Sequence, residues 1–179
     1  MMILISQCDM KQTRKMILLA NFLAIAIVLN LIESAIALSP VPGAKLGFAN
    51  VITLIILYVY SFKDSTALTL LRVILVGLLS GRLLGPTFYM SLSGAAAAII
   101  AMGILKKTNF FGILGVSVVG SIFHVFGQIG AGIFVIGSTA IIYWMPLMLL
   151  LSIPAGVITG LIGKRFVSVW DTWHNKIEN

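Results

Sequence analysis

The sequence predicts an all-α integral membrane protein that folds as a bundle of six transmembrane helices. Of its 179 residues, 60% are hydrophobic and only 9% are charged, whereas soluble domains carry about 25% charged residues. The apolar residues fall into six stretches that lack the alternating pattern of a β-barrel strand. Because lipid offers no hydrogen-bond partners, the backbone of such stretches is expected to be helical.

The six apolar stretches set the expected helix boundaries, with 16–165 as one membrane domain between cytoplasmic segments 1–15 and 166–179. A helix needs about 17–25 apolar residues to cross about 30 Å of hydrocarbon. The second and fourth stretches lie near the lower limit, and the fifth is long enough to tilt or kink. The stretches are 16–38, 46–62, 65–84, 88–105, 110–136 and 140–163.

The connections between the stretches support these boundaries in chain order. Basic residues precede the first stretch, and a segment with proline and glycine, 39–45, separates it from the second. The tight turn at 63–64 leads to the third stretch, and the longer connection 81–87, again with proline and glycine, leads to the fourth. A turn at 106–109 precedes the fifth. Proline restricts the backbone at such a connection, and glycine allows conformations that other residues rarely adopt.

Positive charges give the orientation. Only Lys45 and Arg82 fall on the outer side of a six-helix topology, and Arg72 falls inside the third stretch. The positive-inside rule therefore places both termini in the cytoplasm. The net charge of +7 is mainly this orientation signal, and no basic soluble module is present that would bind nucleic acid. The inner-side residues are Lys11, Arg14, Lys15, Lys63, Lys106, Lys107, Lys164, Arg165 and Lys176.

Polar residues gather where the first two stretches meet and in the middle of the third. Asn30 and Glu33 are three residues apart near the outer end of the first, and Asn50 opens the second. A charged group such as Glu33 or Arg72 costs at least about 2.5–3.5 kcal/mol inside a bilayer. These side chains are therefore expected to face protein or water, either as a structural ion pair or hydrogen-bonded network, or as a binding site.

A second polar pattern lies in the fifth stretch, where Ser117, Ser121, His124 and Gln128 follow steps of four, three and four residues. This spacing places them on one face of a helix. The face is either a hydrogen-bonded seam between helices or the wall of a binding site. We expect no metal site, because His124 lacks carboxylate or thiolate partners.

Catalytic motifs are scarce in this chain. It lacks a phosphate-binding G-x4-G-K-[ST] loop, Asp-rich pairs that would hold magnesium, and a Ser/His/Asp arrangement. With only five acidic residues, the chain is expected to bind or transport a molecule rather than to act as an enzyme, and to carry no cofactor.

The runs Ile32-Glu33-Ser34 and Pro42-Gly43-Ala44-Lys45-Leu46-Gly47-Phe48-Ala49-Asn50 resemble the Gx transporter family, which is also labelled heptaprenyl diphosphate synthase component I. The runs Ser91-Leu92-Ser93-Gly94 and Gly115-Val116-Ser117-Val118-Val119-Gly120 support this likeness. The family pattern has an asparagine where this chain has Val125.

That family is similar to the substrate-binding S components of energy-coupling factor (ECF) transporters, so the resemblance implies an ECF S-component-like fold in the bacterial cell membrane. It implies capture of a small molecule from outside, namely a vitamin, a cofactor precursor or another anionic metabolite. A coupling membrane subunit and two ATPase subunits would supply the energy. Ala20 and Ala24, one helical turn apart, correspond to the motif that docks on the coupling subunit.

The candidate substrate-binding residues combine cations with hydrogen-bonding groups. The cations would attract an anionic group, and the amides and the imidazole would orient the ligand. Glu33 would bind a ligand amine or hold Arg72 or Lys45, while Lys45 and Arg82 are also candidates for plain interface anchors. The set is Asn30, Glu33, Lys45, Asn50, Arg72, Arg82, His124 and Gln128.

Two other functions remain open at this point. The family label favours an accessory membrane subunit in prenyl diphosphate or quinone metabolism. A third option is a membrane subunit of a flavin- or quinone-linked electron-transfer assembly.

Overall fold

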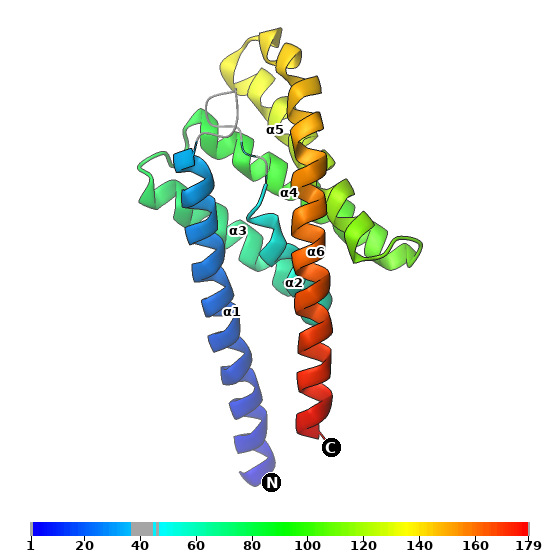
Figure 1. Cartoon of the computed structure of the whole chain (residues 1–179). Helices are drawn as coiled ribbons and strands as arrows, with labels where there is room; N and C mark the ends of the chain where they lie inside the picture. The colour runs from blue at the N-terminus through cyan, green and yellow to red at the C-terminus, as the bar shows by residue number, and fades with distance from the viewer. Residues whose placement is uncertain (1, 37–44, 46, 179) are drawn as a thin grey trace.

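The computed structural model describes residues 2–36, 45 and 47–178, and within them the fold is all-α, as predicted. Six α-helices and one 3-10 helix follow one another along the chain (Figure 1). They are α1 (Met2–Ile36), α2 (Asn50–Val59), α3 (Phe62–Leu79), α4 (Pro86–Thr108), α5 (Ile113–Ile136), η1 (Thr139–Trp144) and α6 (Met145–Glu178).

Four helical segments of the described chain are long and apolar enough to cross a membrane, and they indicate an integral membrane protein. These segments are Gln12–Ala35, Pro86–Thr108, Ile113–Ile136 and Thr139–Trp173. They contain most of the first, fourth, fifth and sixth predicted stretches. The third helix, α3, has 18 residues but carries Lys63, Asp64 and Arg72, and it is not among the four.

The second helix is shorter than the predicted stretch 46–62. α2 has 10 residues, which corresponds to roughly 15 Å, or half the thickness of the hydrocarbon. The backbone explains the difference, because Gly47 has a φ of +90° and the helix begins only at Asn50. α2 is an internal helix: it contacts all five other α-helices, and eight of its residues, from Asn50 to Leu57, are buried.

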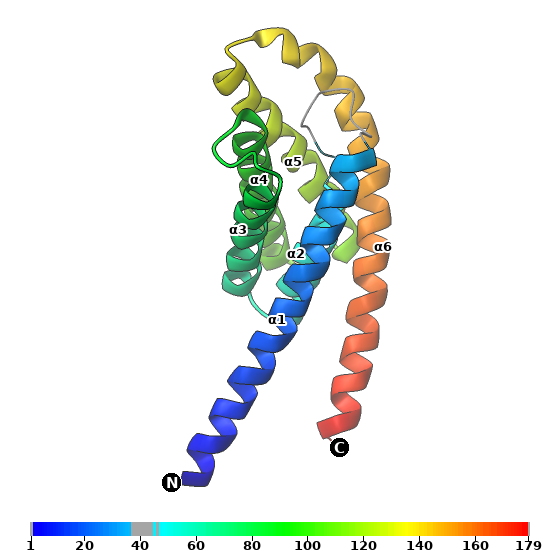
Figure 2. The same ribbon diagram turned by 90° about the vertical axis from the view of Figure 1, so that its left-hand side faces the viewer.

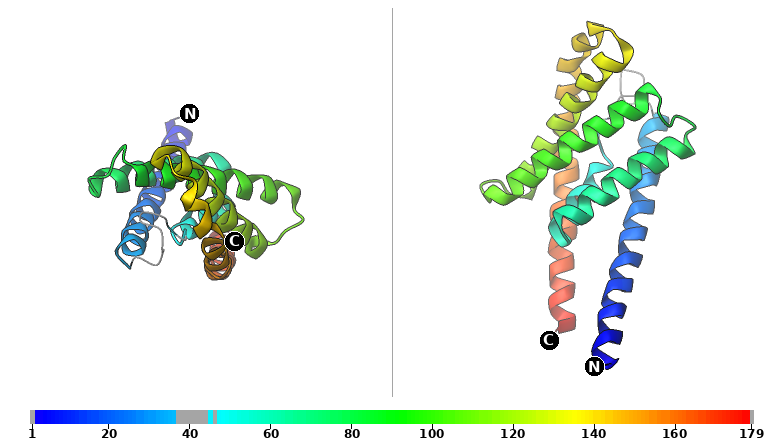
Figure 3. Two further views of the ribbon diagram at one scale, coloured as in Figure 1. Left: turned by 90° about the horizontal axis from the view of Figure 1, so that it is seen from above. Right: turned by 180° about the vertical axis from the view of Figure 1, so that it is seen from behind.

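Both ends of the chain lie at the same end of the molecule. The N-terminal half of α1 and the C-terminal half of α6 extend beyond the other helices there (Figures 1 and 2). The turn from α5 through η1 into α6 forms the opposite tip, as the view from behind also shows (Figure 3). The short helix α2 lies between these outer elements, so the residues at its start are enclosed by the rest of the bundle.

Glycines let α4, α5 and α6 approach one another closely. A Cβ atom added to Gly127 would lie 2.6 Å from the Ser93 carbonyl oxygen and 2.9 Å from the Gly94 Cα atom. One added to Gly156 would lie 2.8 Å from the Val118 Cα atom. Contacts this short leave no room for a side chain, so small residues at these positions fix the distance between the helices.

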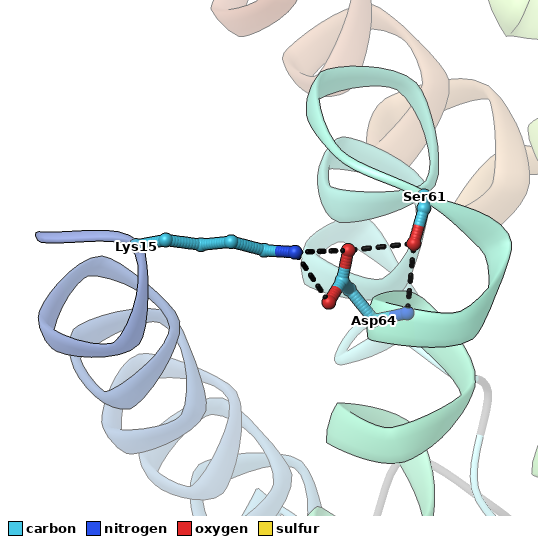
Figure 4. A network of polar contacts seen from close by, with 3 residues as sticks. All are labelled: Lys15, Ser61 and Asp64. Atoms are coloured by element: carbon cyan, nitrogen blue, oxygen red, sulfur yellow. Dashed lines mark hydrogen bonds and ion pairs between the residues drawn. The ribbon is translucent and has the colours of Figure 1, made fainter. Parts of the chain in front are cut away.

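The turn between α2 and α3 is tied to α1 by a polar network (Figure 4). Lys15 Nζ lies 2.8 Å from each carboxylate oxygen of Asp64. Ser61 caps α3 by accepting a hydrogen bond from the Asp64 backbone N–H, and its hydroxyl donates to Asp64 Oδ2. The ammonium of Lys15 also lies 5.6 Å from the centre of the Tyr60 ring.

We expect Asp64→Asn to destabilise the protein by about 0.5 kcal/mol at pH 7, because the Lys15 side chain is 41% exposed and solvent screens the pair. Partial burial acts to raise the pKa of Asp64, but hydrogen bonds from Lys15 and Ser61 outweigh it and lower the pKa below its ordinary 3.8. The ionised form therefore stabilises the fold above about pH 4, and this contribution is lost as the pH falls further. Thermal unfolding at pH 7 and pH 3 measures this effect. The deficit relative to wild type should shrink at pH 3, and the exposed Asp171→Asn serves as control.

Candidate functional site

Six of the eight candidate binding residues surround one small cavity near the end of α1 that is opposite to the N-terminus. The cavity is lined by residues of five helices, α1 to α5, and by residues that precede α2. Gly47, Ala49, Val73 and Ser91 complete its wall. The six are Asn30, Glu33, Lys45, Asn50, Arg72 and His124.

Gly47 shapes the wall of the cavity through its backbone. Its φ of +90° is one that residues with a Cβ atom rarely adopt. Its N–H donates to Glu33 Oε1 at 2.7 Å, which links the segment before α2 to α1. A Cβ atom here would lie 2.9 Å from Asn50 Nδ2 and 3.4 Å from the His124 ring. The glycine therefore allows the backbone, a carboxylate and two polar side chains to meet.

Lys45 is held on both its backbone and its side chain. The amide group of Gln128 accepts a hydrogen bond from Lys45 N at 3.0 Å and donates one to Lys45 O at 2.8 Å. The Lys45 ammonium donates to Asn30 Oδ1. Gln128, a candidate residue outside the cavity wall, thus fixes the backbone of Lys45 beside the cavity.

Arg72 is the most enclosed charged group of the cavity. Its side chain is 2% exposed, and its Nη2 donates to Asn50 Oδ1 at 3.4 Å, which is long for a hydrogen bond. Within the described part of the chain, its Nε and Nη1 atoms and the Asn50 Nδ2 atom have no hydrogen-bond partner. A buried donor without a partner costs about 1–3 kcal/mol. The cavity therefore presents several donors that a bound group would satisfy.

His124 lies on the wall between two glycines. Its ring is 3.4 Å from the position of a Cβ atom on Gly47 and 3.2 Å from that of a Cβ atom on Gly94. The ring is buried, and its nitrogens make no hydrogen bond of good geometry to the described residues. The close approach of α4 and α5 at Gly94 sets the position of this ring.

The cavity is small as it stands. The space open to the centres of water molecules is about 10 Å³, which corresponds to room for about one water. Two cations, Lys45 and Arg72, and one carboxylate, Glu33, face it. It can therefore hold a small polar group.

The structure separates the polar stripe of α5 into two parts. Ser117 hydrogen-bonds to the Gly156 carbonyl and to the Thr159 hydroxyl, each at 2.8 Å, and so belongs to a seam between α5 and α6. His124 and Gln128 turn instead toward the cavity and the Lys45 segment. The seam interpretation therefore holds for Ser117, whereas His124 lines the cavity and Gln128 bonds to Lys45 beside it.

The remaining predicted residues lie away from the cavity. Arg82 is exposed in the connection between α3 and α4 and is not part of the cavity wall. Ala20 and Ala24 are exposed on α1. Sequence reasoning did not place Gly47 and Ser91 at the site, although both lie in runs that carry the family resemblance. Among the described residues, no group of three metal-binding side chains occurs.

Stability should depend on pH through Lys45. Burial lowers the pKa of Lys45 from its ordinary 10.5 to about 8, with Arg72 and Arg82 acting in the same direction and Glu33 opposing them. The folded state therefore loses this proton before the unfolded state does, and the free energy of unfolding gains a contribution as the pH rises from about 8 to 10.5. Thermal unfolding of wild type and Lys45→Met across this range measures the gain. A constant difference between the two proteins would contradict it.

A family model described as heptaprenyl diphosphate synthase component I matches residues 22–166, which is more than half of the chain and includes the whole cavity wall. No curated protein and no solved structure matched the chain.

Proposed function

Because the chain belongs to the heptaprenyl diphosphate synthase component I family, we propose that it is the substrate-binding membrane subunit of an uptake system of that family. In this proposal it is S-component-like, with its six-helix bundle in the bacterial cell membrane and both termini in the cytoplasm. It captures a small molecule, namely a vitamin, a cofactor precursor or another anionic metabolite, in the cavity around Arg72.

The observation that carries the proposal is the contrast between two kinds of buried polar group in one molecule. Structural polar groups elsewhere in the described bundle are paired, as in the contact between Thr53 and Thr69 at 2.9 Å and the hydrogen bond from Ser65 to the Thr53 carbonyl at 2.7 Å. The cavity instead leaves donors of Arg72 and Asn50 unsatisfied. Unpaired buried donors are costly, so a ligand that satisfies them is a physical reason for keeping them.

The position of the cavity supports capture from outside. Asn30 and Glu33 lie in the last two turns of α1, away from the termini that the positive-inside rule places in the cytoplasm. A ligand from the exterior therefore reaches the cavity from the end of the bundle opposite to the termini. The exposed Ala20 and Ala24 lie nearer the cytoplasmic side, where they offer a flat surface for a helix of the coupling subunit. Two ATPase subunits complete the assembly.

A second candidate function follows from the description of the family. It is an accessory membrane subunit in prenyl diphosphate or quinone metabolism, in which the chain binds a synthase rather than transporter subunits. The exposed apolar surface of α1 would serve that partner equally well, so the identity of the partner decides between the two functions.

The deciding experiment is purification of the protein from native membranes in a mild detergent, followed by identification of its partners. Recovery of a coupling subunit and ATPases supports uptake, and recovery of a prenyl diphosphate synthase supports the second function. Replacing both Ala20 and Ala24 with leucine should release the coupling subunit. Ala35→Leu is the matched control, because Ala35 is also exposed on α1 and should leave the assembly intact.

A further inference from the structure

The unsatisfied groups of the cavity are mainly hydrogen-bond donors. Arg72 contributes Nε and Nη1, and Asn50 contributes Nδ2, none of which has a partner in the described chain. The two side chains are only 2% and 5% exposed. Hydrogen-bond acceptors would satisfy these donors, and the oxygen atoms of an anion are the strongest acceptors. The part of the ligand that enters here is therefore an acidic group.

The charges around the cavity limit how acidic that group is. Lys45 and Arg72 are positive, Glu33 is negative, and all three line the cavity. One of the oxygens of Glu33 accepts the hydrogen bond from Gly47 N, so this carboxylate is part of the wall. The described wall thus has one excess positive charge. A single negative charge balances it, whereas a second would be buried without a counter-charge at a large cost.

The size of the cavity gives the same limit. Its space of about 10 Å³ matches roughly one water molecule. A carboxylate is flat and presents two oxygens, whereas a phosphate group is tetrahedral and carries about −1.5 to −2 charges at pH 7. A diphosphate is larger and more highly charged still. Of the common acidic groups, the carboxylate demands the least expansion.

We propose that this cavity binds the carboxylate of a monocarboxylic ligand, with its oxygens accepting hydrogen bonds from Arg72 and Asn50. The planar guanidinium of Arg72 suits a planar carboxylate. The rest of the ligand extends toward Lys45, which also lines the cavity. This inference rests on the proposed function, in which the cavity is the ligand site, and it narrows the ligand to one chemical class.

The test uses the full-length protein and simple anions as probes. Thermal unfolding is followed at pH 7 in sodium acetate, sodium methyl phosphate (the phosphate probe) or sodium diphosphate, with ionic strength held constant by sodium chloride. We expect saturating acetate to raise the unfolding midpoint by at least about 2 °C, and phosphate and diphosphate to leave it unchanged. Arg72→Gln should lose the acetate shift. Lys107→Gln also removes one positive charge, from an exposed site at the other end of α4, and should keep it.

A second variant tests the charge argument by gain of binding. Glu33→Gln keeps an oxygen that can accept from Gly47 N, but it raises the excess charge of the wall from one to two. Phosphate should then stabilise this variant by at least about 2 °C, although it does not stabilise wild type. This readout holds even if Arg72→Gln does not fold.

A shift with phosphate or diphosphate in wild type equal to that with acetate would overturn the inference, as would no shift with any of the three anions. Failure of the proposed function has a different signature. If acetate acts as expected but the protein purifies with a prenyl diphosphate synthase, the carboxylate site stands and uptake does not. If transporter subunits are recovered and phosphate is preferred, uptake stands and the carboxylate assignment does not.

Discussion

Gly127→Ala is expected to destabilise the protein by about 1–3 kcal/mol, the usual range for overpacking a tight interface, and to abolish ligand binding. The new Cβ atom would lie 2.6 Å from the backbone oxygen of Ser93 and 2.9 Å from the Cα atom of Gly94. Neither is the end of a flexible side chain, so α4 and α5 must separate. Because His124 and Gln128 flank this glycine on α5, their separation from α4 disturbs both the cavity wall and the hold on Lys45.

The same helix supplies a matched control. A Cβ atom added to Gly130 meets no atom within 4 Å, and alanine favours the helix by up to about 1 kcal/mol over glycine. Gly130→Ala should therefore match or exceed the thermal stability of wild type. Equal behaviour of the two variants in thermal unfolding would show that the close approach of α4 and α5 does not hold the bundle together.

Gln128→Leu is expected to free the segment at Lys45 and weaken ligand binding by at least tenfold. It removes both hydrogen bonds between the amide group and the Lys45 backbone, which measure 3.0 and 2.8 Å. The Lys45 N–H and C=O groups then lose these partners, and a buried polar group without a partner costs about 1–3 kcal/mol. A loss of 1.4 kcal/mol already corresponds to a tenfold change in affinity.

Hydrogen–deuterium exchange of the amides of Lys45 and Gly47 measures this release directly. Exchange should rise in Gln128→Leu and stay unchanged in Ser117→Ala, which removes a hydrogen bond from the seam between α5 and α6. Slow exchange at Lys45 in the Gln128 variant would mean that other contacts hold the segment. In that case Gln128 would have no role at the site.

Much of the fold follows from hydropathy and charge, because both report directly on what lipid tolerates. The helical character, the four long apolar spans and the common location of the two termini are consequences of that constraint. The length of α2 does not follow from hydropathy, because the sequence of residues 46–62 is mainly apolar whether or not all of it is helical. A helix start at Asn50 depends on the positive φ of Gly47 and on its hydrogen bond to Glu33, and both are tertiary effects.

Part of the candidate site was predictable because it is costly to bury a charged side chain in lipid. Glu33 and Arg72 had to face protein or water, and they do line one cavity. Helical spacing placed Ser117 and Gln128 on the same face of α5, but spacing carries no information on which neighbour each one meets. One meets α6 and the other the Lys45 segment. Arg82 was predicted on the outer side of the membrane, where it could have reached the cavity. In the structure it lies in the connection after α3, and its side chain is exposed.

The most direct measurement is native mass spectrometry of the protein released gently from its own membranes. We expect wild type and Lys107→Gln to carry one small acidic molecule in a 1:1 ratio. Arg72→Gln should lose that molecule while keeping the same bound lipids, because the guanidinium supplies the donors that hold it. Wild type and Arg72→Gln carrying identical adducts, or wild type carrying lipids alone, would contradict the account: the polar cluster would then be a scaffold rather than a binding site.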